Sequence, residues 1–298
     1  MGGSSARRSR LAAAGLAALT LAALISPTAA HALISATAAH AQTNANADDQ
    51  ALLERFAPVL AVRHQKKECG SGERFRPMSV DAIFGRDDVA LRDADDNIVK
   101  RAPTAKDLAG RGEDYWLDFP YDALKPGCNY EKWFRTFDTT PEIYGRVTKA
   151  DGKVVLQYYF YWVFNQWNDL HESDWEGIQL EFATGSIDKA MNSMPSRIAY
   201  AQHEGAEYAD AGNEKVQFVD ETHPVVYSSE GSHASYFSST RWFGKSGSTG
   251  FGCDNTTAKV DRIEPAVITL PRQAPTTGEF AWLSYQGHWG ERERDREL

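Results

Sequence analysis

The strongest hydrophobic pattern in the chain is a run of β-branched and aromatic residues at 154–164 (VVLQYYFYWVF). Its length and composition predict a strand that is buried on both faces. Residues 174–182 (DWEGIQLEF) alternate between polar and apolar positions, which predicts a strand with one face in the core. Further short strands are predicted at residues 198–202, 224–228 and 267–270.

Helical patterns are scarce by comparison. Residues 51–62 fit either a short amphipathic helix or a first strand, and residues 187–193 fit a helix. Residues 42–50 have the composition of a polar linker, residues 64–74 of a loop, and residues 85–113, rich in Asp, Arg and Gly, of a solvated segment. The chain is therefore predicted to be mainly β, a β-sandwich-like single domain with long loops and few short helices.

The first 41 residues have the layout of a signal peptide. A cationic stretch (RRSR) precedes the apolar residues 11–25, and the small-residue pattern AHA ends at Ala41. About fifteen apolar residues are short for a membrane span, which needs about 20. The paired arginines weakly resemble a twin-arginine signal. We expect cleavage after export, a secreted or cell-surface location, and no transmembrane span in the mature chain; an uncleaved anchor is the alternative.

Charge and cysteine content narrow the class of protein further. Removal of residues 1–41 takes away three Arg and no acidic residue, so the net charge changes from −9 to −12. Such a chain lacks the basic face of a nucleic-acid-binding protein.

Two of Cys69, Cys128 and Cys253 are expected to form a disulfide after export, while the third is buried, free or used between chains. The sequence leaves the pairing and the oligomeric state open.

The segment NQWNDLHESDWEGIQLEF contains the candidate chemistry. With a period of two, Asp174 and Glu176 share the face of the apolar residues that follow them. Buried carboxylates are costly, so they bind a cation, pair with Arg or take up a proton. His171 lies close enough to join them, and one His with two carboxylates suits Ca²⁺ or Mg²⁺ completed by water. The alternative is a structural cluster of ion pairs and hydrogen bonds. Trp175, on the opposite face, is expected to pack under a second layer.

Two later stretches add histidines. In YAQHEGAE, His203 ends a predicted strand and Glu204 adds a carboxylate, with small neighbours that leave room for a ligand. In HPVVYSSEGSHASYF, a turn presents Ser232 and His233. Adjacent side chains on an extended chain point apart, so these two are not expected to form a nucleophile–base pair, and a GxSxG elbow is missing. Catalytic residues therefore remain unassigned.

These blocks, followed by GCD at 252–254 and by WLSYQGHWGE, together resemble the Vps62-related family, whose bacterial members are exported. The resemblance covers about residues 55–291 and assigns a family without a function. It divides the chain into a signal peptide (1–41), a polar linker and entry segment (42–54), the β-rich domain and a charged tail (292–298). Family members usually continue with an NGPTGP-like run, so we expect the C-terminus, ERERDREL, to be shortened or divergent.

A second, local resemblance is to the necrosis- and ethylene-inducing cytolysins, whose signature is GHRHDWE where this chain has LHESDWE. In those β-sandwich toxins the His, Asp and Glu that match His171, Asp174 and Glu176 surround a divalent cation. His203 with Gly205 is the nearest match to a later His that contributes there. The upstream acidic ligand of the toxins has no clear counterpart; the candidates are Asn165, Asn168 and Asp169. Their sphingolipid-headgroup ligand does not carry over, because the binding loops are not what matches.

Three functions are compatible with these residues. The first is a secreted, divalent-cation-dependent binding protein for a glycan or lipid headgroup, with Trp167, Trp175 or Trp242 stacking on the ligand and His203, Glu204 and His233 beside it. The second is a structural cell-surface protein in which the cluster only fixes loops. The third is a metal-assisted hydrolase with His203 or His233 as general base. We rank them in this order, because no nucleophile motif favours the enzyme.

Overall fold

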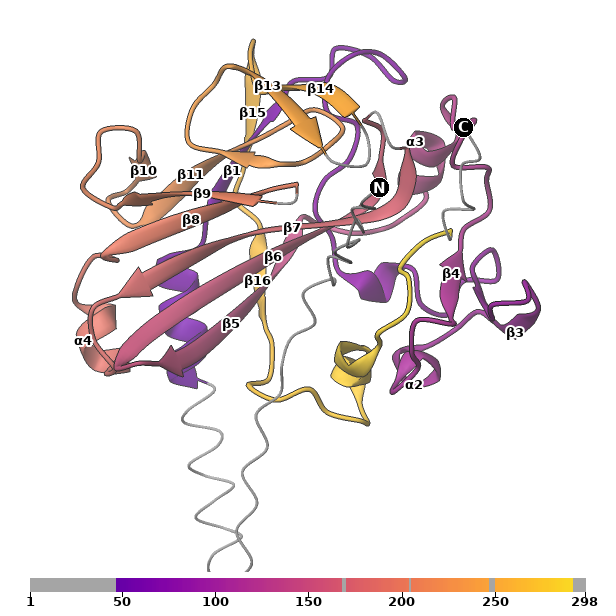
Figure 1. Cartoon of the computed structure of the whole chain (residues 1–298), viewed down its shortest axis with the longest axis horizontal. Helices are drawn as coiled ribbons and strands as arrows, with labels where there is room; N and C mark the ends of the chain where they lie inside the picture. Colours follow the sequence, from indigo (N-terminus) through magenta and orange to yellow (C-terminus); the bar gives the residue numbers. More distant parts are fainter. Residues whose placement is uncertain (1–46, 168–169, 204, 247–249, 292–298) are drawn as a thin grey trace, which may run out of the picture. The chain divides into compact units, whose positions relative to one another are not determined.

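A six-stranded sheet forms the centre of the part of the chain that can be described (Figure 1). The computed structural model describes residues 47–167, 170–203, 205–246 and 250–291. Neighbouring strands are antiparallel except for β16 and β5, which are parallel. In spatial order the strands are β16 (Ala266–Thr269), β5 (Glu142–Ala150), β6 (Lys153–Asn165), β7 (His171–Phe182), β8 (Arg197–Gln202) and β9 (Gly205–Asp210).

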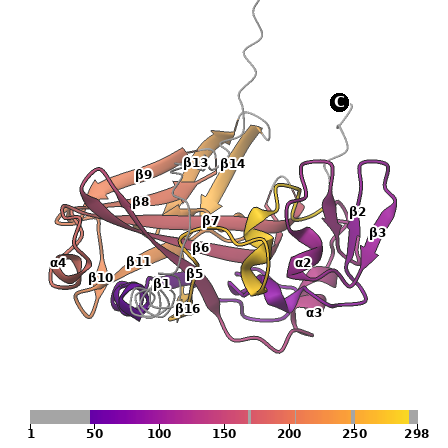
Figure 2. The ribbon, with the colours of Figure 1, turned by 90° about the horizontal axis from the view of Figure 1, so that it is seen from below.

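A second sheet covers one face of the first (Figure 2). The Tyr200 hydroxyl on β8 donates a hydrogen bond to the Val225 carbonyl of the second sheet, at 3.0 Å. A helix at residues 47–55 lies at the same face, where the ring of Phe56, just after it, meets Phe182 at 5.0 Å. The two sheets therefore enclose one core, as in a β-sandwich. The second sheet contains β10 (Phe218–Val219), β11 (His223–Ser228), β1 (Val59–Arg63) and β15 (Val260–Ile263), with β12 (Ser235–Tyr236) paired to β11.

Smaller elements gather around these two layers. A three-stranded sheet lies at one end of the large sheet, and a two-stranded hairpin lies beside β8 and β9 (Figure 2). The former contains β3 (Ile98–Arg101), β2 (Ala90–Arg92) and β4 (Trp116–Asp118); the latter contains β13 (Arg241–Ser246) and β14 (Gly250–Asn255). The helical segments besides residues 47–55 are η1 (Val80–Ala82), α2 (Ala105–Leu108), α3 (Asn129–Phe134), α4 (Ile187–Met191) and η2 (Glu279–Ser284). Within the described ranges, no helix is long and apolar enough to cross a membrane.

The predicted mainly β fold is confirmed. The long strands could be predicted because local sequence patterns specify them. The aromatic run becomes β6, the alternating segment becomes β7, and the three shorter predictions become β8, β11 and β16. The helix predicted at 187–193 is α4. Residues 51–62 contain both alternatives in succession, a helix and then β1.

Two composition-based predictions were wrong in part. Residues 47–50, predicted as linker, are helical, because Asp49 is buried and accepts two hydrogen bonds from Arg272, at 2.8 and 2.9 Å. Residues 85–113, predicted as a solvated segment, contain β2, β3 and α2, and Leu91 and Leu108 are fully buried among them. The predicted signal peptide (1–41) and charged tail (292–298) lie outside the described residues.

Candidate functional site

The inner face of β7 carries the predicted carboxylates. Asp174 pairs with Trp162 of β6, and Glu176 pairs with Phe160, so both acids lie on the face that Ile178 continues into the core. Trp175 lies on the opposite face, as predicted. Its ring contacts four aromatic side chains of a second layer: Tyr144, Tyr161, Trp282 and Trp289.

A buried histidine connects Asp174 to a distant loop. His233 is fully buried, and its Nδ1 lies 2.8 Å from Asp174 Oδ2, while its Nε2 lies 3.5 Å from Glu73 Oε1. Its ring stacks on Trp162, with 4.2 Å between centroids and 5° between planes. Burial by itself lowers the pKa of His233, but the Glu73 and Asp174 carboxylates outweigh it and raise the pKa to about 9. A cationic imidazolium held between two carboxylates does not suit the role of general base.

Glu73 comes from the loop at residues 64–74. Its carboxylate accepts hydrogen bonds from the backbone N–H groups of Phe75 and Gly231, each at 2.9 Å. Burial raises the pKa of Glu73, but His233 and these amides outweigh that effect and leave the pKa below its usual value. These contacts favour the ionised form of Glu73 beside His233.

The carboxyl group of Glu176 lacks the hydrogen-bond donors that stabilise the charge of Glu73 and Asp174. Its exposed fraction is 8%, and no described side chain donates a hydrogen bond to it. Burial first, and then the charges of Asp174 and Asp254, raise the pKa of Glu176 well above its usual range; only the backbone N–H of Gly177 acts in the other direction. Such a group holds a proton unless a cation takes the place of that proton.

Asp254, on β14, is the opposite case. Its Oδ1 accepts hydrogen bonds from the hydroxyls of Ser229, at 2.9 Å, and of Ser232. Its Oδ2 lies 2.7 Å from both His203 Nε2 and the Tyr236 hydroxyl. A carboxylate offers about four lone-pair positions, so Asp254 is saturated and contributes charge rather than an open ligand position. We name Glu73, Asp174, Glu176, His203, His233 and Asp254 the acidic cluster.

The aromatic side chain of Trp167 lies at the edge of this cluster. The half-buried indole of Trp167 meets the His203 ring at 4.8 Å. Trp167 also covers Gly252, where a Cβ would lie 1.7 Å from the indole, so only glycine admits the ring there. The ring of Trp242 stacks on Tyr236 at 4.9 Å and, among the described residues, contacts none of the cluster's histidine rings. Of the three tryptophans predicted to stack on a ligand, Trp167 is the one beside the cluster.

The predicted ligand triad is only partly assembled. The Nδ1 of His171 donates to the Ser173 carbonyl at 2.7 Å, so this ring nitrogen is not available as a metal ligand. The ligand atoms of His171, Asp174 and Glu176 do not all lie within 4.8 Å of one another. Asp174 instead pairs with His233, and its Oδ2 also accepts a hydrogen bond from Asn165 at 3.2 Å.

The remaining candidates have separate places. Ser232 bonds to Asp254 whereas His233 bonds to Asp174, so the two do not form a nucleophile–base pair, as predicted. Glu204 lies outside the described residues, as do Asn168 and Asp169.

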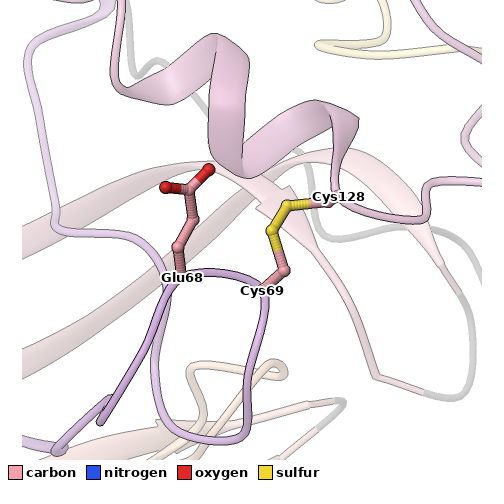
Figure 3. Close-up of side chains that lie close together, drawn as sticks. All are labelled: Glu68, Cys69 and Cys128. Carbon is pink, nitrogen blue, oxygen red and sulfur yellow. A yellow bond between two sulfur atoms is a disulfide. The ribbon is translucent and has the colours of Figure 1, made fainter.

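The structure also fixes the disulfide. Cys69 pairs with Cys128, and Cys253 is a free, exposed thiol on β14. Among the described residues, the one group of three metal-ligand types within 4.8 Å of one another is Glu68, Cys69 and Cys128. Figure 3 shows that the two sulfurs are bonded to each other, so they are not available as metal ligands.

Sequence reasoning missed Glu73 and Asp254 as members of the cluster. Glu73 stands in a segment that has only the composition of a loop, and 158 residues separate it from its hydrogen-bond donor Gly231. Asp254 belongs to the GCD block, so the family resemblance gave a signal there, although no spacing rule connects it to His203.

Fold and site together define a β-sandwich-like protein with a largely buried acidic cluster beside an aromatic side chain. The chain belongs to the family described as vacuolar protein sorting-associated protein 62 (Vps62), which matches residues 31–294. The predicted family is thereby confirmed. A sequence comparison with curated proteins found no match.

Similar solved structures include necrosis- and ethylene-inducing proteins, as the second resemblance implied. NLPPya in complex with mannosamine is 14% identical, with 74% of this chain and 73% of that chain covered and a TM-score of 0.36. NLPPya in complex with glucosamine is 13% identical, with the same coverage and TM-score. Necrosis and Ethylene inducing Protein 2, from the causal agent of cocoa's witches' broom disease, is 15% identical, with 72% of each chain covered and a TM-score of 0.32. Likeness at this level does not define the ligand of this chain.

Proposed function

We propose that this protein binds a sugar, free or as the headgroup of a lipid, through a divalent cation held by Asp174 and Glu176. The observation that carries the proposal is the excess of carboxylates in the acidic cluster. Four acidic side chains face two histidines, and Glu176 is buried without a donor side chain among the described residues. A divalent cation neutralises this excess without protonating Glu176.

The donor set fits a hard cation. The two hydrogen bonds from His233 and Asn165 both go to Oδ2 of Asp174, which leaves Oδ1 as a ligand atom. Glu176 supplies a second carboxylate, and His171 is the third proposed ligand, with water at the other positions. Carboxylate oxygens with one imidazole suit Ca²⁺, Mg²⁺ or Mn²⁺ better than a thiophilic metal.

The position of Trp167 favours a sugar as the ligand. Neighbouring hydroxyls of a sugar ring ligate a hard cation, while the apolar face of the ring packs on an indole. Trp167 is linked to the carboxylates through His203 and Asp254, so one ring can contact both features. Secretion, inferred from the N-terminal segment, would bring the site into contact with extracellular glycans.

The proposal is tested by titration of the purified protein with glucosamine and mannosamine, the sugars in two similar structures, in the presence of Ca²⁺ and after treatment with a chelator. Binding should require Ca²⁺, and Trp167→Ala should weaken it about tenfold, since one stacking contact contributes about 1.5 kcal/mol. Trp167→Phe, which keeps an aromatic face, should retain most of the affinity. Equal sugar affinity with and without Ca²⁺ would contradict the cation bridge.

A further inference from the structure

The loop at residues 64–74 reaches the acidic cluster through a single buried side chain. Glu73, His233 and Asp174 form a line in which an imidazole ring separates two carboxylates, at 3.5 Å on one side and 2.8 Å on the other. Glu73 and His233 have side chains with no exposed surface. No three of the described residues Glu73, Asp174, Glu176 and His233 have ligand atoms that all lie within 4.8 Å of one another.

Building on the proposed function, we infer that Glu73 and His233 are positioning residues for the cation site. His233 Nδ1 donates to Oδ2 of Asp174 and so holds this carboxylate in one orientation, with Oδ1 left for the cation, while Glu73 lies on the other side of the imidazole. We name this arrangement the Glu73–His233–Asp174 relay. In many metal sites, hydrogen bonds from residues outside the ligand set fix the orientation of a metal-ligating side chain. Loss of such a hydrogen bond usually weakens metal binding about 10- to 100-fold.

Two observations support a role beyond packing. Nε2 of His233 is buried without a hydrogen-bond partner in the described residues, and it faces Oε1 of Glu73 at 3.5 Å. The backbone at His233 has φ 56°, a conformation that L residues rarely adopt. A residue kept in this conformation, with its ring stacked flat on Trp162, has one orientation for its Nδ1.

Glu230 provides a matched control for Glu73. It joins the same loop to the same turn, accepting a hydrogen bond from the Gly72 N–H at 2.6 Å and pairing with Arg63, but it does not contact His233. Glu73→Gln and Glu230→Gln each replace a carboxylate that accepts a backbone N–H from this region. Both substitutions disturb a contact between the loop and the turn, but only Glu73→Gln changes a side chain that faces His233.

Ca²⁺ affinity of the purified protein, measured by calorimetry, tests the inference. Glu73→Gln should bind Ca²⁺ at least about tenfold more weakly than the parent, whereas Glu230→Gln should bind within about twofold of it. Unfolding midpoints without Ca²⁺ show whether the two variants are equally folded. Equal Ca²⁺ affinity of Glu73→Gln and the parent would overturn the relay but leave the cation site intact. A parent that does not bind Ca²⁺ would overturn the proposed function and the relay with it.

A second variant tests the relay independently, in case Glu73→Gln does not fold. Glycine tolerates positive φ, so His233→Gly suits the backbone and removes only the ring. It should lose at least about tenfold in Ca²⁺ affinity. Added imidazole should restore part of the loss by taking the place of the missing ring, and it does not compete for the ion, because imidazole prefers transition metals to Ca²⁺. Imidazole should not change the affinity of Glu73→Gln. A His233→Gly variant with parental affinity would also contradict the relay.

Discussion

Glu172 shows how strongly the surroundings of one residue decide its chemistry. It shares the inner face of β7 with Asp174 and Glu176, but its Oε2 accepts hydrogen bonds from the N–H groups of Phe119, at 3.2 Å, and Glu291, at 2.9 Å. Its Oε1 lies 2.7 Å from the hydroxyl of Tyr130, which also lies 2.8 Å from the Tyr121 carbonyl. One phenol proton serves only one of these oxygens. A neutral Glu172 that donates to Tyr130 satisfies both contacts.

The neutral form predicts a specific pH dependence. Burial first of all raises the pKa of Glu172 from 4.5 to about 8. Because the folded-state pKa lies above the unfolded one, this carboxyl contributes full stability below about pH 4.5, and its contribution is lost as the pH rises toward 8. Glu172→Gln keeps a donor toward Tyr130 and an acceptor toward the two amides. The stability of the variant relative to the parent should therefore increase with pH in this interval, by at most ~1.4 kcal/mol for each pH unit.

Urea unfolding of both proteins at about pH 5, 6.5 and 8, which spans this interval, measures the difference. Two parallel stability curves would mean that Glu172 is ionised in the folded protein throughout this range.

Trp175 lies on the same strand as the proposed cation ligands, but we expect it to affect the stability of the fold and not Ca²⁺ binding. Its ring packs against Tyr161 at 5.0 Å and Trp289 at 5.5 Å on the face opposite Asp174. Trp175→Ala should lower the free energy of unfolding by about 3–5 kcal/mol, while Ca²⁺ affinity should change little in protein that remains folded. Denaturant titration and calorimetry give the two values. A loss of Ca²⁺ binding at unchanged stability would assign Trp175 to the site.

At the scale of elements, β7 and the hairpin β13–β14 position different halves of the site. The period of two in β7 places its acids on the inner face and its tryptophan on the outer one. The hairpin brings Asp254 to the cluster and Gly252 under Trp167. The proposed cation ligands thus come from the strand, and the proposed stacking surface depends on the hairpin.

A substitution in the hairpin should separate these two contributions. In Gly252→Ala the new Cβ would lie 1.7 Å from the indole, so Trp167 must move. Sugar affinity should fall about tenfold, while Ca²⁺ affinity stays near that of the parent. Gly212→Ala, at a position where a Cβ meets nothing within 4 Å, is the control and should change neither. Equal losses of both affinities in Gly252→Ala would show that stacking and cation binding are not separable.

The same elements show how far sequence reasoning extends. The inner-face placement of Asp174 and Glu176 follows from local alternation, which is why it could be predicted. The link from Asp174 to Glu73 depends on how a loop and a turn meet after folding, and no local pattern contains that information. The hairpin was missed for a related reason: RWFGKSGSTGFGC is rich in glycine and lacks regular alternation.

At the scale of the whole molecule, the acidic cluster joins five distant stretches of the chain. The loop that carries Glu73, the strand β7, the turn after β8 that carries His203, the turn at 229–233 and β14 meet at this point. A cation bound here stabilises the folded protein only, because the unfolded chain does not assemble the ligands. At a Ca²⁺ concentration about 100 times the dissociation constant, the free energy of unfolding should increase by about 2.7 kcal/mol. Thermal unfolding with Ca²⁺ and with chelator measures it, and identical midpoints at that Ca²⁺ concentration would contradict the linkage.

The most direct test of the cation site is a calorimetric titration of the parent, Asp174→Asn and Glu176→Gln with Ca²⁺. We expect saturable binding by the parent, and binding weakened by about a hundredfold or more in each variant. Glu176→Gln should also unfold at a higher temperature than the parent when no cation is present, because it removes the uncompensated buried carboxyl. Parental Ca²⁺ binding by both variants would place the site elsewhere, and no binding by the parent would leave the acidic cluster as a structural feature.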